Sequence, residues 1–359
     1  MKYKQLIDYY KNNQFRLIDQ EENHKKFYLL RSVSKANTFK DFCKEFNLEG
    51  YTLDDVLDDI NINDEDLINY IKRKFKPKTE EEIKAIEVEL NKMQNFDWGG
   101  SAGNNLEKNI VNNVIKKTLS YDEIQNALAG SIQRSVYGYT LNSWYNHWSS
   151  IMIEEIFNAH PSVIPTIDLV EKIDFFIKSI PFDLKVTYFP EELMKEKIAD
   201  KLKEKFGAKS ELICCKRLAK TLNIAIPEDL DDRSLTICLQ NLFSESIDSK
   251  AIDFMNQLKD IKQEVYTYYL NNPKELIIWL YENQGEMRFD AANRFYVVLI
   301  DREKPFESWK LKRNVNLLKE GINEKINSFD KNNLNLIDFY WFKDGKTYSC
   351  YSELLFIYK

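Results

Sequence analysis

The distribution of proline is the feature that most limits how this chain can fold. Four of the eight prolines in its 359 residues, Pro161, Pro165, Pro181 and Pro190, fall within one stretch of 30 residues. Proline lacks the backbone donor that a helix needs, and its ring clashes with the preceding turn, so this stretch cannot be one long helix. Its apolar runs are therefore predicted to form strands or loops.

Helical patterns flank this proline-rich stretch on both sides. Apolar residues recur at three- and four-residue spacings over 3–10, 39–46, 53–60 and 143–157, as in amphipathic helices. Beyond the prolines we predict helices over 191–206, 247–271 and 274–283, a buried strand over 295–300 and a hairpin over 339–351 that turns at Asp344-Gly345. These elements indicate a mixed α/β fold, with a central mixed sheet flanked by helices.

The charge of the chain changes sign abruptly near Pro77, where acidic residues give way to a run of lysine and arginine. A length of 359 residues allows more than one domain. We predict a helical N-terminal region over residues 1–95 and a larger α/β domain over residues 96–359.

Composition narrows the classes of function and the compartment. The formal net charge of −6 argues against a protein that coats nucleic acid through overall basicity. Five cysteines without a Cys-x-x-Cys pair exclude a zinc ribbon or a disulfide framework, and a reducing cytoplasm is the expected location.

The stretch from Lys172 to Tyr188 carries the residues that indicate chemistry. Both of its halves alternate between apolar and polar residues, so a short turn near Ser179-Ile180 would make them an antiparallel hairpin. If residue 178 pairs with 181, Asp174 lies opposite Lys185, and Asp183 shares their face. The opposite face is apolar and predicted to point into the core.

Two carboxylates and a lysine on one face suit metal-assisted cleavage of phosphodiesters. Carboxylate oxygens are the ligands that Mg²⁺ prefers, and the ion lowers the pKa of an attacking water. An ammonium group can orient that water or stabilise the charge that develops on the phosphate. In the alternative interpretation, these side chains are only surface charges on an edge hairpin.

Asp174, followed after eight residues by Asp183-Leu184-Lys185 on a hairpin, resembles the active site of the PD-(D/E)xK nucleases, the superfamily of most type II restriction endonucleases. The resemblance implies a restriction-endonuclease-like fold with Asp174, Asp183 and Lys185 as catalytic residues. It also implies one or two Mg²⁺ ions held by the acids, a double-stranded DNA substrate cut by a homodimer, and 5′-phosphate products. A cognate DNA methyltransferase would be the genetic partner, and the N-terminal region would serve DNA recognition or dimerisation.

This superfamily often adds a glutamate from the helix that precedes the hairpin. On a helical wheel of residues 143–157, Glu155 falls in the centre of an apolar stripe, whereas Glu154 points towards solvent. The stripe consists of Trp144, Trp148, Ile151 and Met152. A carboxylate in an apolar stripe needs a partner, so Glu155 is predicted as the third acid and metal ligand. Whether Glu155 or Glu154 completes the site stays open, and a buried structural pair is the alternative role for Glu155. Asp168 is the substitute if Asp174 is not a ligand.

Two other functions remain open at this point. The chain could be a nonspecific nuclease of repair or of a mobile element. It could also be a non-catalytic α/β module that binds DNA or protein.

Overall fold

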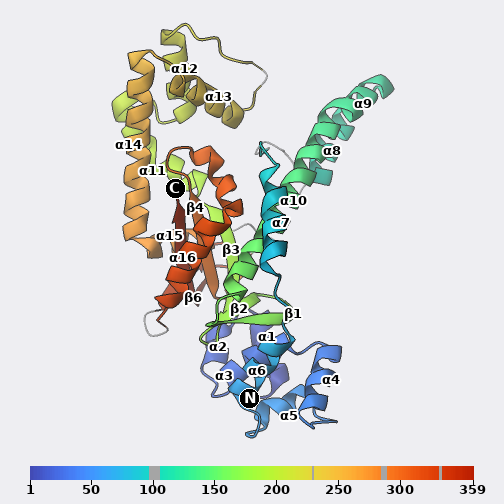
Figure 1. Ribbon diagram of the computed structural model, residues 1–359. Coiled ribbons are helices and arrows are strands. Elements are labelled where there is room, and N and C mark those ends of the chain that lie inside the picture. Colours follow the sequence, from blue (N-terminus) through green and yellow to red (C-terminus); the bar gives the residue numbers. More distant parts are fainter. Residues whose placement is uncertain (97–105, 229, 284–288, 331–333) are drawn as a thin grey trace.

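The computed structural model of the chain describes residues 1–96, 106–228, 230–283, 289–330 and 334–359 (Figure 1). Its centre is a six-stranded sheet with the order β1-β2-β3-β4-β6-β5. Helices cover both faces of this sheet, so the predicted mixed α/β class is confirmed.

The strands include every run predicted as extended. They are β1 Val163–Val170, β2 Ile173–Ile177, β3 Ile180–Tyr188, β4 Arg294–Ile300, β5 Asn335–Trp341 and β6 Lys346–Tyr358. β1, β2 and β3 form an antiparallel meander, and β5 and β6 form the predicted C-terminal hairpin. β4 lies between β3 and β6 and runs parallel to both. All residues of β4 are buried, as expected of a strand covered on both faces.

The helices fall into groups along the chain. The N-terminal group is α1 Tyr3–Lys11, α2 Phe15–Asp19, α3 His24–Ser32, α4 Ala36–Glu45, α5 Leu53–Asp58 and α6 Asp64–Lys74. The next group is α7 Glu80–Asn91, α8 Leu106–Asn113, η2 Ile115–Lys117, α9 Tyr121–Ala127, η3 Leu128–Ile132 and α10 Gln133–Asn158. The last group is α11 Glu191–Phe206, α12 Glu211–Thr221, α13 Asp232–Ser244, α14 Ser249–Asn271, α15 Pro273–Glu282, η5 Pro305–Arg313 and α16 Val315–Asn327.

Two hydrophobic cores lie on opposite faces of the sheet. The first joins α1–α6 and α11–α15 to the face that carries Phe176 and Tyr296. The second joins α7, α10, η5 and α16 to the face that carries Phe175, Phe182 and Phe295. The helices before residue 75 thus share a core with the sheet, whereas α7 packs against α10 in the other layer.

Local signals in the sequence explain where several helices begin. Thr52 and Thr79 each accept a hydrogen bond from the backbone of the third helical residue, which closes the capping boxes of α5 and α7. In Figure 1, α8, α9 and the first part of α10 extend away from the sheet. Within the described residues, none of the helices combines the length and the apolar character that crossing a membrane requires.

Candidate acidic centre

The β2–β3 hairpin has a different register from the one predicted. The structure pairs Ile177 with Ile180, so the turn is Lys178-Ser179, and the pairing of 178 with 181 was wrong. Both turn residues have positive φ, 49° and 67°, as two-residue hairpin turns of the common type require. Ile180 is β-branched and would resist that conformation, which explains why the turn lies one residue earlier.

The corrected register brings the two acids closer than predicted. The ladder pairs Phe175 with Phe182, and continuing it by one step sets Asp174 opposite Asp183 instead of Lys185. The register differs from the predicted one by an even number, so all three side chains keep their common face.

Asp174 lies where β2 and β3 diverge. Its Oδ2 accepts a hydrogen bond of 2.6 Å from the backbone N of Leu184, a donor that no longer pairs with β2. Burial, the charge of Asp183 and a hydrogen bond between the two carboxyl groups together raise the pKa of the Asp174 carboxyl to about 6. The two acids are therefore close enough to share a proton or a cation.

Asp183 lies in the middle of the sheet and is only 7% exposed, so the interpretation as an exposed edge hairpin does not hold for it. Its Oδ1 accepts a hydrogen bond of 2.5 Å from Lys185 Nζ. Its Oδ2 lies 3.5 Å from Nε of Arg294, the first residue of β4, which pairs with Asp183 in the parallel ladder. The Lys185 side chain is 44% exposed and reaches the centre from the solvent side.

Helix α10 is rotated by about one residue, ~100°, relative to the prediction. Its buried stripe keeps Met152 from the prediction but runs through Tyr145 and Ile156 instead of Trp144 and Trp148. Phe157 then stacks on Phe175 of β2 with 4.7 Å between ring centroids, which fixes the end of α10 beside the hairpin.

This rotation leaves both glutamates half-buried and gives them different neighbours. Oε2 of Glu155 accepts a hydrogen bond of 3.1 Å from the backbone N of Lys78, just before α7. Glu154 is half-buried instead of pointing to solvent, and burial followed by the charges of Asp174 and Glu155 raises the pKa of its carboxyl to about 7. Of the two glutamates, Glu154 is therefore the one whose carboxyl lies close enough to Asp174 to feel its charge.

The two glutamates can be separated by matched substitutions. If the centre cleaves DNA, Glu154→Gln should slow cleavage by about 10–100-fold, because it removes a charge that adjoins Asp174. Glu155→Gln should stay within about threefold of wild type, since glutamine can still accept the hydrogen bond from Lys78. Initial cleavage rates at fixed Mg²⁺ measure both. The reverse order of effects would restore Glu155 as the third acid.

The remaining acid predicted as a substitute has another partner. Asp168 lies in β1, where its Oδ1 is 3.7 Å from Lys35 Nζ at the start of α4. In the described residues no group of three or more His, Cys, Asp or Glu side chains is arranged to hold a metal ion. The centre thus offers two adjoining carboxylates, with Glu154 next to them.

The raised pKa values predict how stability depends on pH. The folded-state pKa values of Asp174 and Glu154 lie above their ordinary values of 3.8 and 4.5. Stability from these groups is therefore greatest near pH 4 and is lost as the pH rises through about 7. Without metal, Asp174→Asn should melt at a higher temperature than wild type at pH 8 and show no such gain at pH 4. The exposed Asp338→Asn is the control, and a lower melting temperature for Asp174→Asn at pH 8 would contradict the assignment.

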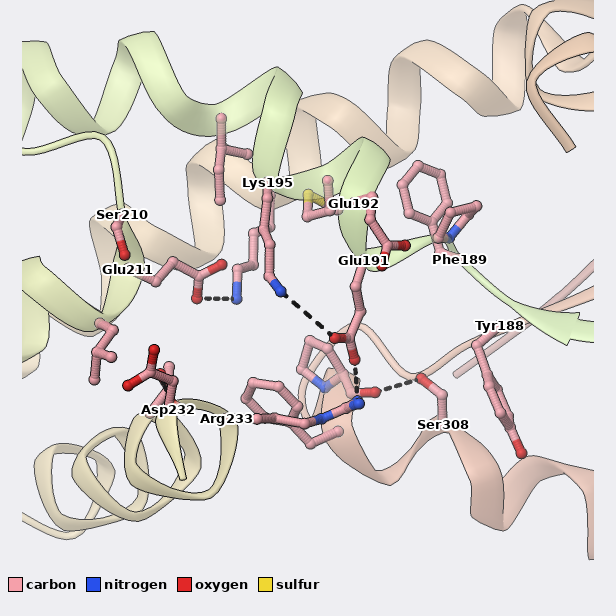
Figure 2. Close-up of a pocket in the computed structure, with 18 of the residues that line it drawn as sticks. Tyr188, Phe189, Glu191, Glu192, Lys195, Ser210, Glu211, Asp232, Arg233 and Ser308 are labelled. Carbon is pink, nitrogen blue, oxygen red and sulfur yellow. Dashed lines mark hydrogen bonds and ion pairs between the residues drawn. The ribbon is translucent and has the colours of Figure 1, made fainter. Parts of the chain in front are cut away.

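A pocket of about 910 Å³ lies elsewhere, at the carboxyl ends of β3 and β4 (Figure 2). Crevices at the carboxyl ends of parallel strands commonly bind ligands. The first turns of α11, α12 and α13 line it, together with parts of α14 and η5. Asp174, Asp183 and Lys185 are not among its lining residues, so this pocket is not the acidic centre.

The charges in this pocket pair largely with one another. Figure 2 shows Glu191 between Arg233 and Lys195, whose Nζ lies 3.9 Å from it. Glu211 accepts a hydrogen bond from Lys262 Nζ at 2.6 Å and another from the side-chain amide of Gln240 in α13. Because acidic and basic side chains balance in this way, the pocket favours neither a cationic nor an anionic ligand.

Arg294 is the residue of the centre that the sequence patterns missed. One sequence feature could have revealed it, because Arg294 stands directly before the apolar run 295–300. A charge buried together with such a run needs a partner. Comparisons with protein-family models, with curated proteins and with solved structures found no match to this chain. The geometry of the acidic centre is thus the basis for assigning a function.

Proposed function

We propose that this chain is a Mg²⁺-dependent DNA endonuclease whose centre is of the PD-(D/E)xK kind. One observation carries the proposal: Asp174 and Asp183 adjoin at the fork of a hairpin inside a mixed sheet, with the Lys185 ammonium on the same face. The tripeptide Asp183-Leu184-Lys185 alone would be weak support, because an acid two residues before a lysine is common in a charge-rich chain. Here the acid is buried in a strand and has a second acid beside it.

The donor set fits a magnesium ion. Both hairpin acids supply hard carboxylate oxygens, which Mg²⁺ prefers while keeping several waters. The raised pKa of Asp174 also supports the fit, because two adjoining carboxylates repel one another when ionised and a divalent cation would offset that repulsion. Asp174 and Asp183 would hold one or two ions, with Glu154 next to them. When bound, the metal would neutralise charge on the scissile phosphate and lower the pKa of a water.

The residues of the chain divide the remaining tasks. The hydrogen bond from the Leu184 backbone orients Asp174, and the sheet fixes Asp183. Lys185 is exposed enough to reach substrate, and its ammonium can hold the attacking water or the developing phosphate charge.

The finer parts of the proposal rest on the family resemblance. We propose a type II restriction enzyme that acts in the cytoplasm as a homodimer and cuts double-stranded DNA at a specific site. It would leave 5′-phosphate and 3′-hydroxyl ends, and a DNA methyltransferase would be its genetic partner. A nonspecific nuclease of repair or of a mobile element and a non-catalytic binding module are the competing functions.

One incubation tests these possibilities. Purified protein is mixed with phage DNA and Mg²⁺ at about 10 mM. A matched reaction also contains a chelator at about the same concentration as the metal. Discrete bands that depend on Mg²⁺ support a restriction enzyme, and a smear supports a nonspecific nuclease. Intact DNA under both conditions contradicts the nuclease proposal.

A further inference from the structure

Asp183 is in contact with two cations whose surroundings differ. Lys185 approaches Oδ1 with a half-exposed side chain, whereas Arg294 approaches Oδ2 with a side chain that is only 5% exposed. A half-exposed lysine on a flexible stem can move away, but a buried guanidinium cannot be removed from the carboxylate without burying an unpaired charge.

Arg294 is itself held on several sides. Its Nη1 donates to Tyr296 Oη at 3.2 Å, and the guanidinium lies 5.0 Å from the ring centre of Tyr281. Its backbone carbonyl accepts from Ser352 Oγ at 2.9 Å. The parallel ladder places it directly beside Asp183. These contacts hold the guanidinium from β3, from its own strand β4 and from α15, while Ser352 of β6 holds the backbone of Arg294.

The backbone next to Arg294 also holds Asp183. The backbone N of Asp183 donates to the carbonyl oxygen of Asn293 at 2.9 Å. The Asn293 side chain donates to Pro181 O and accepts from Tyr351 N, so it ties β3 to β6 across the start of β4. Asp183 is thus tied to the same short segment through its backbone and through Oδ2.

Further charges connect this segment to the hairpin. Asp290 is close enough for the charges of Lys172, Arg294 and Asp183 to act on its pKa, which burial raises. Its Oδ1 lies 3.6 Å from Lys172 Nζ, in the turn between β1 and β2. The charge of Arg294 therefore acts on Asp290 as well as on Asp183, with which it pairs directly.

We propose that Arg294 is a positioning residue of the acidic centre, which holds Asp183 through Oδ2 as a permanent counter-ion and leaves Oδ1 to bind the metal. This inference rests on the proposed nuclease function. Lys185 is then the cation that yields Oδ1 when the metal binds, while Arg294 stays in place. The arrangement fixes the carboxylate and also limits the negative charge that attracts the ion.

Neutral replacements of Arg294 should combine tighter Mg²⁺ binding with slower cleavage, a pair of effects that structural damage would not produce. Removing one positive charge a few ångströms from a divalent ion should tighten Mg²⁺ binding by about tenfold or more. The freed carboxylate should also slow cleavage by about tenfold or more at saturating Mg²⁺, because its oxygens are no longer oriented. Simple disruption would weaken binding and cleavage together.

The experiment compares Arg294→Met, Arg294→Gln and Arg294→Lys with wild type and with Arg302→Met. Arg302 follows the same strand and stacks on Tyr358, so it controls for loss of an arginine from this region. Mg²⁺ affinity is measured by calorimetry at pH 8 without DNA, cleavage by initial rates, and folding by thermal melting. Arg294→Lys should keep the affinity of wild type within about threefold, since it keeps the charge. If Arg294→Met does not fold, Arg294→Gln carries the test.

Unchanged or weaker Mg²⁺ binding by folded neutral variants would overturn the role of Arg294, and so would cleavage at the rate of the Arg302→Met control. If Arg294→Lys lost Mg²⁺ affinity while the neutral variants kept it, Arg294 would not act as a counter-ion. A wild-type protein that binds Mg²⁺ but leaves DNA intact contradicts the nuclease function instead, and the affinities then decide the role of Arg294.

Discussion

Replacing Lys185 with alanine should reduce DNA cleavage by about three orders of magnitude or more, because it removes a charged group that acts on the water or on the developing phosphate charge. The fold should survive, since the side chain is 44% exposed and lies on the polar face of the hairpin. DNA binding should persist, because the phosphate-contacting surface is otherwise intact. Rates of plasmid cleavage and a mobility-shift assay measure the two properties separately.

Lys346→Ala is a suitable control for Lys185→Ala, because Lys346 is an exposed lysine at the start of β6, away from the acidic centre. It should cleave DNA at the wild-type rate. If Lys185→Ala also cleaves near that rate, this lysine has no part in the reaction, and the nuclease proposal loses its main support.

Asp183→Asn should abolish cleavage and weaken Mg²⁺ binding together, the latter by about 100-fold or more, because a neutral amide replaces a carboxylate ligand. Excess Mg²⁺ should restore cleavage only slightly, since the lost oxygen also positions the ion. The substitution leaves the buried Arg294 without this charge, so thermal melting must accompany the assay. Calorimetric titration with Mg²⁺ gives the affinity.

The contrast with Lys185→Ala makes this result informative. The lysine variant should keep metal binding and lose cleavage, whereas the Asp183 variant should lose both. Asp338→Asn, an exposed aspartate of β5, is the matched control and should lose neither. An Asp183→Asn protein with wild-type affinity for Mg²⁺ would remove Asp183 from the metal site.

The sequence predicted the face of the hairpin but not its exact pairing. Alternation of polar and apolar residues determines which side chains share a face, and that face is the same for any register shift of two. The turn determines the register, and it depends on which two residues accept positive φ, Lys178 and Ser179 here. A local pattern therefore placed Asp174, Asp183 and Lys185 on one face while assigning Asp174 the wrong cross-strand partner.

The parts that the sequence did not predict depend on distant packing. The parallel ladder brings Arg294 beside Asp183, although the two residues are far apart in the chain. The rotation of α10, which favours Glu154 over Glu155, follows from the packing of Phe157 on Phe175. A helical wheel gives the spacing of residues, but neighbouring elements decide which side of an apolar helix is buried.

The shared core of α1–α6 and the sheet has a consequence for dissecting this protein. Phe27, Tyr28 and Leu29 are fully buried in the same cluster as Ile164 and Phe176 of the sheet. Lys172 Nζ also donates to Asn13 Oδ1 at 2.8 Å, in the loop between α1 and α2. A fragment that begins after residue 75 would expose this apolar face to water and would aggregate rather than stay folded. The N-terminal helices therefore cannot be exchanged between proteins as an independent cassette, and any change in what they contact must evolve together with the strands beneath them.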